Sequence, residues 1–477
     1  MTKYTTTTRT SRRTFLRNSA VGGLGLIVLK NSRSARGYVA NDQLQIAVIG
    51  IGGRGMGFIG KQGWSSVQEQ MGGRIAALCD VNRERAARAF ELHPDVPKYE
   101  DYRVMVDEMA PQLDGVIVAT PDHTHAPASA YALRAGLHVF CEKGLTCTVD
   151  EARVLADLTF EQQLSTQMGN QGGYNDRVIE HVWAGTLGEI QTIHMWGGGG
   201  AGPRERPSNG HEVPEYLKWN LWLGPATYRP YHPEWLRWQR WRDFANGHPG
   251  MWGAHLWATL FKAMKIDTLW PIGKQPPVAG RKTLQVTAEC SGVPEATYPR
   301  WRIVHWDIPA RMDMPPIRLT WFAGGGEADQ RRFAALRELF SMHPEWGDPD
   351  DERWTSWTGN LWSGTEGVMY TFGHGDSTVA MLPKEKFDDV GRPPEALPRP
   401  LPGKFLGGWV QGMGDGPAPM GCFNTFSGPF TEWSLLANVA SLFPEETLEF
   451  DPVDCRIVNH AEADEKLRRP HRDGWTV

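Results

Sequence analysis

A glutamate and a lysine stand side by side at the end of an apolar run in this chain. The run "HVFC", residues 138–141, has the aromatic and β-branched residues typical of a buried strand, and Glu142, Lys143 and Gly144 follow it. Neither charge is stable inside a sheet. The pair therefore lies either on a solvated edge or at a ligand crevice, where a lysine can take a proton from a substrate hydroxyl.

A glycine-rich turn earlier in the chain indicates what such a crevice would hold. The apolar stretch 44–49 leads directly into a G-x-G-x-x-G pattern, which contains Gly50, Gly52, Gly53, Arg54 and Gly55. Such a turn brings backbone amides close to a pyrophosphate at the start of a helix. The pattern is weak alone, but its position after an apolar strand predicts a dinucleotide site.

The residue that ends the second strand indicates which dinucleotide is bound. The stretch "RIAALCD" ends at Asp80, which can accept hydrogen bonds from the adenosine ribose hydroxyls and therefore favours NAD over NADP. The segment "KQGWSSVQEQMGG" is interpreted as an insertion, because Asp80 lies further from Gly50 than the usual ~20 residues. NADP stays open, since Arg54 beside the adenine pocket could also bind a 2'-phosphate.

The elements that must position these residues alternate along the chain. Helical stretches are expected at residues 83–90 and 102–109 and in "HAPASAYALRAG", and strands in "LDGVIVATP" and "LHVFCEK". This order predicts an α/β fold with a doubly wound parallel sheet, in which ligands bind beyond the carboxyl ends of the strands. Thr120, Pro121 and His123 are expected at the same edge as Glu142 and Lys143.

The whole chain is long enough for two domains. It has 477 residues, 40% of them hydrophobic and 22% charged, which is the balance of a globular protein. A net charge of -5 offers no surface for nucleic acid. Six scattered cysteines without a C-x-x-C spacing suggest no metal site and no essential disulfide. We predict a first domain at 41–165 and a second at 166–477.

The first forty residues differ in kind from the rest. Arg12 and Arg13 precede Phe15 and Leu16, and an apolar run at 20–29 follows that is too short to span a bilayer. This order resembles a twin-arginine export signal, which predicts a periplasmic or other extracytoplasmic protein with no further transmembrane span. The alternatives are a disordered basic terminus or an uncleaved signal that acts as an anchor.

Five motifs in order resemble the glucose-fructose oxidoreductase, inositol dehydrogenase and MocA (Gfo/Idh/MocA) family. They are "IAVIGIGGRG", "ALCDVN", "GVIVATPDHTH", "HVFCEKG" and "QMGNQGG", and two later segments, "WNLWLGPATYRPYHP" and "RWRDFANGHPGMWGAH", resemble its exported branch. The resemblance implies a catalytic Lys143, with Glu142 near the nicotinamide ribose and Gln171 among the cofactor residues. It also implies a second α/β domain built on a large, open, mostly antiparallel sheet, which often forms a homo-oligomer interface.

Two residues depart from the family pattern. Gly144 replaces the proline that follows the lysine, which would loosen the backbone that aims Lys143. Met251 replaces an Asp four residues before His255, one helical turn away, and a thioether cannot accept a proton at neutral pH. Either Lys143 and His255 suffice, or another acid substitutes, with Asp243, Glu212 and Asp267 as the candidates. A hydrogen-bonded structural role for His255 is the alternative.

The resemblance favours an NAD(P)-dependent oxidoreductase that removes hydride from a sugar or polyol hydroxyl. A redox-neutral enzyme that cleaves glycosides by oxidation and elimination is one alternative, and a catalytically silent carbohydrate-binding protein is another. Seven tryptophans between residues 219 and 257 are predicted mostly to be core or interface residues, with one or two available to stack on a sugar ring.

Overall fold

The computed structural model describes residues 43–170, 173–399, 405–414 and 416–477. The export-signal region and Gln171 therefore lie outside the described residues. Among the residues described, no helix is long and apolar enough to cross a membrane. All six cysteines carry free thiols, and Cys79 and Cys141 are buried as strand residues.

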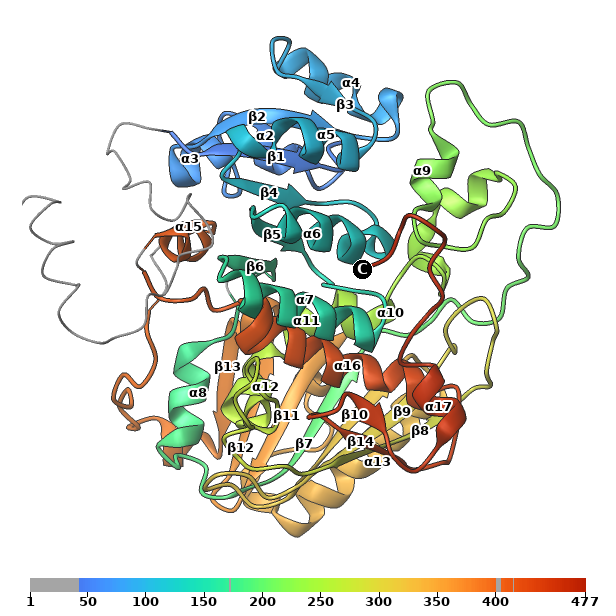
Figure 1. Ribbon diagram of the computed structural model, residues 1–477. Helices are drawn as coiled ribbons and strands as arrows, with labels where there is room; N and C mark the ends of the chain where they lie inside the picture. Colours follow the sequence, from blue (N-terminus) through green and yellow to red (C-terminus); the bar gives the residue numbers. More distant parts are fainter. Residues whose placement is uncertain (1–42, 171–172, 400–404, 415) are drawn as a thin grey trace, which may run out of the picture. The chain divides into compact units, whose positions relative to one another are not determined.

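The first sheet has six strands, and every neighbouring pair is parallel. Across the sheet they are β3 Lys98–Tyr99, β2 Arg74–Cys79, β1 Gln45–Ile49, β4 Gly115–Val118, β5 His138–Glu142 and β6 Thr166–Gly169 (Figure 1). The direction of winding reverses between β1 and β4, which confirms the doubly wound fold. Because β6 belongs to this sheet, the first domain extends beyond the boundary expected at residue 165.

The helices of this domain begin and end where local signals indicate. They are α2 Met56–Ile59, α3 Val67–Met71, α4 Arg83–Leu92, α5 Tyr102–Met109, α6 His125–Arg134 and α7 Val149–Gln162. Asn82 caps α4 by accepting a hydrogen bond from the Arg85 amide at 3.0 Å, and Thr148 with Glu151 forms a capping box on α7. Gly136, with φ of 77°, turns the chain after α6.

A segment from near the carboxyl terminus completes the core of the first domain. Helix α15, Gly407–Met413, places Trp409 edge-on to Phe140 of β5, with 5.8 Å between ring centroids. Leu406 and Trp409 are fully buried in the same cluster as Ile46 and Val48 of β1. The first domain is therefore built from two segments that lie far apart in the sequence.

The second sheet has nine strands, and only the β7–β10 pair is parallel. Across the sheet they are β13 Thr378–Leu382, β12 Val368–Phe372, β11 Thr358–Gly364, β7 Ile190–Gly197, β10 Ile317–Ala323, β9 Arg302–Ile308, β8 Leu284–Cys290, β14 Leu448–Asp451 and β15 Arg456–Ile457. This confirms the large, mostly antiparallel sheet.

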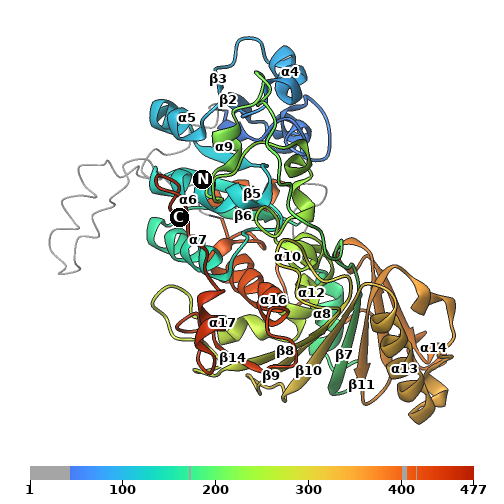
Figure 2. The same cartoon turned by 90° about the vertical axis from the view of Figure 1, so that its right-hand side faces the viewer.

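Helices cover both faces of the second sheet (Figure 2). One face packs against α8 Asp176–Trp183, α12 Ala258–Ala263 and α16 Gly428–Ala440, with Trp257, Trp306 and Trp433 between the layers. On the other face, α13 Glu327–Met342 packs Leu336 and Phe340 against strand residues such as Trp196. The other α-helices of the described residues are α9 Trp219–Leu223, α10 Gly247–Met251, α11 Gly253–Leu256, α14 Lys384–Phe387 and α17 Ala461–Glu465.

Candidate active site

The glycine-rich turn is packed so tightly that larger residues would not fit. Gly50 has a φ of 83°, and a Cβ there would lie 2.7 Å from the Ala119 carbonyl carbon. At Gly52 a Cβ would lie 2.6 Å from Cβ of Arg85, and at Gly55 it would lie 3.0 Å from the Gly50 carbonyl carbon. Glycine at the first, third and sixth positions thus allows the strand, the turn and helix α4 to approach one another.

Two backbone amides of the same turn donate no hydrogen bond to the described residues. Among the described residues, the amides of Gly53 and Arg54 have no hydrogen-bond acceptor, and the space where a Gly53 Cβ would stand is open apart from the Arg85 guanidinium at 3.5 Å. Free amides beside an arginine at the carboxyl edge of a parallel sheet suit a pyrophosphate. These residues therefore fit a dinucleotide.

Asp80 lies at the end of β2 and orders this turn. One carboxylate oxygen accepts hydrogen bonds from the amides of Ile51 at 2.9 Å and Gly52 at 2.8 Å, and the other accepts from Asn82 at 2.9 Å. Burial raises the pKa of Asp80, and these amide hydrogen bonds oppose that rise. A carboxylate at this position disfavours a 2'-phosphate on the adenosine ribose.

Arg54 points away from Asp80, toward the end of β5. Its Nε lies 2.9 Å from Oε1 of Glu142, and its guanidinium lies 4.5 Å from the ring centroids of both Phe58 and Trp64. Because its charge is paired with Glu142, Arg54 is less available to a 2'-phosphate. Trp64 belongs to the insertion noted in the sequence, so that insertion helps to fix Arg54.

Glu142 is buried where β5 ends, and its charge is balanced by its neighbours. Burial raises the pKa of this carboxyl, while Arg54 and Lys143 counteract the rise. A Cβ on Gly169 of β6 would lie 3.0 Å from the Glu142 carboxyl carbon, so the neighbouring strand leaves room for this side chain. The Glu-Lys pair is therefore an organised site and not a solvated edge.

Lys143 follows β5 and lies close to a second buried acid, Asp122. Burial raises the pKa of Asp122 to about 7, and the charge of Lys143 and a hydrogen bond from the Asn246 amide at 3.2 Å hold it from rising further. Asp122 lies in the motif "TPDHTH", between Pro121 and His123, which were both expected at the cofactor edge. Lys143 influences its titration as it does that of Glu142, and Asp122 was not among the residues expected from the sequence to form the site.

His125 links the strand ends around the lysine. Its Nδ1 lies 2.8 Å from the Gly144 carbonyl and its Nε2 lies 2.9 Å from the Thr120 carbonyl. Thr120 and Pro121 stand at the carboxyl end of β4, as expected. His123 is different, because it is fully buried between Trp222 and Phe244 and its Nε2 lies 2.8 Å from the Trp222 carbonyl. These contacts give His123 a packing role.

Gly144 is required by close packing and is not a loose link. A Cβ at this position would lie 2.6 Å from the carbonyl oxygen of Gly250 in α10 and would also overlap the Asn246 side chain. The second domain thus presses against the backbone beside Lys143. This corrects the expectation that glycine in place of proline leaves the lysine poorly aimed.

His255 comes from α11 of the second domain and lies near Lys143. It is 3% exposed, and its ring centroid lies 4.7 Å from that of His374 and 6.0 Å from that of Trp252. Burial, Lys143 and His374 lower the pKa of His255 to about 3, so its imidazole is neutral at pH 7. A neutral imidazole can exchange hydrogen bonds with a substrate hydroxyl without adding charge beside the lysine.

None of the three acids proposed to replace the family Asp is shown to join this site. Asp243 pairs with Arg229 at 2.6 Å, Asp267 pairs with Lys262 at 2.5 Å, and Glu212 lies in an exposed loop. Met251 lines a neighbouring pocket together with Trp252. His374, from the turn between β12 and β13, was also missed, because nothing in the sequence around it indicates a site.

Five of the seven clustered tryptophans are buried, as predicted, and Trp252 is one of the two that are not.

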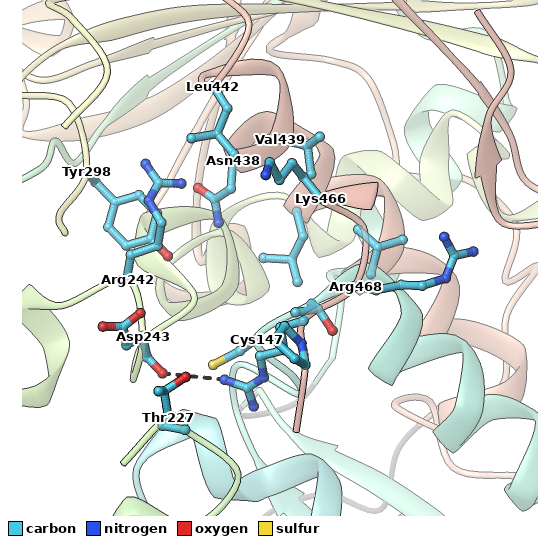
Figure 3. Close-up of a pocket in the computed structure, with 16 residues that line it drawn as sticks. Cys147, Thr227, Arg242, Asp243, Tyr298, Asn438, Val439, Leu442, Lys466 and Arg468 are labelled. Carbon is cyan, nitrogen blue, oxygen red and sulfur yellow. Dashed lines mark hydrogen bonds between the residues drawn. The ribbon is translucent and has the colours of Figure 1, made fainter. Parts of the chain in front are cut away.

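A separate pocket of about 250 Å³ lies beside the amino end of α7 and contains Cys147, Arg242, Asp243 and Tyr298 (Figure 3). Lys143 and His255 are not among its lining residues. Asp243 thus lies in a different pocket from the predicted catalytic pair.

Residues 44–170 match the model of an oxidoreductase family with an NAD-binding Rossmann fold, GFO_IDH_MocA. This match places the first domain, residues 44–170, in the Gfo/Idh/MocA family. Its relatives include a glycosyl hydrolase family 109 protein of Saccharopolyspora erythraea, 30% identical over 38% of this chain and 44% of that protein. An inositol 2-dehydrogenase of Gluconacetobacter diazotrophicus is 32% identical over 31% of this chain and 44% of that protein.

The chain thus spans less than half the length of these curated relatives. Among solved structures, an aldose-aldose oxidoreductase from Caulobacter crescentus complexed with glycerol covers 86% of this chain and 100% of its own, with 15% identity and a TM-score of 0.45. A levoglucosan dehydrogenase complexed with NADH covers 86% of this chain and 99% of its own, with 15% identity and a TM-score of 0.48.

Proposed function

We propose that this protein is an NAD-dependent oxidoreductase acting on a hydroxyl group of a sugar or polyol. The observation that carries the proposal is the position of Lys143, which follows β5 on the carboxyl edge of the NAD-binding sheet. Glu142, Asp122 and His255 are all close enough to interact with its charge. Proton transfer at this edge, next to a nicotinamide, is what oxidation of an alcohol requires.

NAD, when bound, supplies the acceptor for the hydride that leaves the substrate carbon. The amides of Gly53 and Arg54 would hold its pyrophosphate, and Asp80 its adenosine ribose. Lys143, in its neutral amine form, takes the hydroxyl proton and becomes the ammonium, and neutral His255 orients the same hydroxyl by a hydrogen bond. Asp122 keeps a compensating carboxyl beside Lys143, while Arg54 neutralises Glu142.

Redox-neutral cleavage of a glycoside is the second candidate. Two observations favour it: Met251 stands where the family has an acid, and several relatives are called glycosyl hydrolase family 109 proteins. In that reaction the hydride returns to the sugar after a neighbouring leaving group has been eliminated. Both candidates use Lys143 and NAD, so they differ in the product and not in the first step.

The test is to incubate purified protein and NAD with a panel of sugars, polyols and aryl glycosides, and to identify products by mass spectrometry. An oxidised product formed with one equivalent of NADH supports the oxidoreductase. Release of the aglycone without net NADH supports cleavage. Binding of a sugar without any product would contradict both and leave a carbohydrate-binding protein.

Replacing Met251 by aspartate separates the two candidates further. If Met251 is a simple loss from a dehydrogenase, Met251→Asp should raise NADH formation, on the scale of a gained general base, by ~10-fold or more. If the site is built for cleavage, Met251→Asp should leave NADH formation unchanged or lower it. Initial rates at 340 nm with the best substrate of the panel decide between these outcomes.

Export and self-association complete the proposal. The Arg12-Arg13 motif and the apolar run after it support export by the twin-arginine route to an extracytoplasmic compartment. Cell fractionation should find the wild-type chain outside the cytoplasm and the Arg12→Lys, Arg13→Lys double variant inside it. The family resemblance supports a homo-oligomer, which light scattering after size exclusion would measure.

A further inference from the structure

A pocket of about 500 Å³ adjoins the active site on the side of Met251. Its volume is in the range of sites that hold small ligands. Met251 and Trp252 line it, and α10, to which Met251 belongs, contacts the lysine backbone through the Gly250 carbonyl beside Gly144. A substrate that reaches Lys143 from this side would therefore place its remaining groups in the pocket.

The charge of this pocket has one sign. Arg240, Arg300 and Arg302 line it, and no aspartate or glutamate is among its lining residues. Arg240 is compensated outside the pocket by Glu234, with 3.3 Å between Nη1 and Oε2. Arg300 is exposed and forms no ion pair within the described part of the chain.

Arg302 is the unusual member, because it is 3% exposed and has no acidic partner. Its Nη1 donates hydrogen bonds to Oδ1 of Asn438 at 2.9 Å and to Oγ of Ser441 at 3.2 Å, and its guanidinium lies 4.6 Å from the Trp321 ring centroid. Within the described residues, nothing accepts a hydrogen bond from its Nε or Nη2. A buried cation without a partner is costly, so an anion is expected to complete it.

Two further observations agree with a site for an anion. Burial lowers the pKa of Arg302 to about 9, and no carboxylate contributes to that value, yet the group remains charged at neutral pH. His248 also lines the pocket, stacked on Trp321 with 5.3 Å between ring centroids, and its buried Nε2 has no hydrogen-bond partner. Both side chains hold unused donors or acceptors in a confined space.

We infer that this pocket binds an anionic group of the substrate, so that the proposed enzyme acts on an acidic sugar. The inference rests on the proposed function for the reaction, but the binding step can be tested without turnover. The free edge of Arg302, formed by Nε and Nη2, presents two parallel donors that match a carboxylate. A uronic acid therefore fits the pocket, and a sugar phosphate shares the same charge.

The experiment measures binding to the full chain carrying Lys143→Met and saturated with NADH, by isothermal titration calorimetry. The probes are D-glucuronate, D-glucose 6-phosphate and D-glucose. We expect at least one anion to bind ~10-fold or more tightly than D-glucose, on the scale of a hydrogen-bonded charge pair. Preference for glucuronate identifies the carboxylate, and preference for the phosphate identifies a sugar phosphate.

Variants of Arg302 test whether this arginine causes the preference for anionic sugars. Arg302→Gln should remove most of the preference, and Arg302→Lys should keep only part of it because lysine lacks the two-donor edge. If Arg302→Gln does not fold, Arg300→Gln at the exposed rim should weaken binding of the anion several-fold. Arg318→Gln, on the same sheet but outside the pocket, is the matched control and should change nothing.

Equal binding of all three sugars, or failure of both anions to bind, would overturn the inference. An anion preference that survives in folded Arg302→Gln would do the same. The proposed function is tested separately, by hydride transfer in the wild-type chain. An anion that binds but is not oxidised would therefore contradict the reaction and leave the binding site standing.

Discussion

The charge of Asp122, beside Lys143, depends strongly on the folded structure. An aspartate in an unfolded chain has a pKa near 3.9, whereas burial raises the pKa of Asp122 to about 7. Between about pH 4 and pH 7 the folded protein therefore binds more protons than the unfolded chain, and its stability falls as the pH rises. Above pH 7 the full cost of the buried charge is present.

We predict that Asp122→Asn removes this cost. Relative to wild type, its free energy of unfolding should be nearly unchanged at pH 4 and higher by about 1 to 3 kcal/mol at pH 8. The amide oxygen can still accept the hydrogen bond from Asn246, so packing is kept. Urea unfolding at the two pH values measures the difference, and the exposed Asp107→Asn should show none. A variant less stable than wild type at pH 8 would contradict the account.

Gly144 is expected to be required at its position, although the family has a proline there. Gly144→Ala places a methyl group 2.6 Å from the Gly250 carbonyl, so it should lower stability by about 1 to 3 kcal/mol, the usual cost of overpacking, and should reduce turnover. Gly391→Ala, where a Cβ meets open space and φ is not positive, controls for loss of a glycine alone. Thermal unfolding of both variants, with NADH titration, would show whether only Gly144 disturbs the site.

At the scale of elements, most of the first domain could be predicted. Helices at 83–90 and 102–109 and the strand ending at Glu142 lie where apolar periodicity and capping residues place them, because those signals are local. The contribution of Trp409 to the same core could not be predicted, since packing between distant segments has no local signal. The packing of α13 on the second sheet could not be predicted for the same reason.

Helix α13 provides the test at this scale. Phe340 is 2% exposed and its ring centroid lies 5.5 Å from that of Trp354. Phe340→Ala should destabilise the protein by about 3 to 5 kcal/mol, because the cavity cannot be filled from solvent. If the sheet face that α13 covers were instead a homo-oligomer interface, the variant would mainly change the oligomeric state. Denaturant unfolding and light scattering on the same sample separate these outcomes.

At the scale of the whole molecule, the site is assembled from both domains. Lys143 and Asp122 follow strands of the first sheet, whereas His255 and Asn246 come from the second domain, close enough for Lys143 to lower the pKa of His255. The sequence indicated Lys143 and His255 by motif. It could not choose among Asp243, Glu212 and Asp267, because ion pairing and burial are properties of the folded chain.

We propose above all that Lys143 transfers the substrate proton at the edge of an NAD-binding sheet. The most direct measurement compares wild type with Lys143→Met, using the best substrate from the panel and following NADH at 340 nm. We predict that kcat falls ~100-fold or more, the scale for loss of a general acid or base, while the Kd for NADH changes little. Wild-type turnover in folded Lys143→Met would contradict the claim.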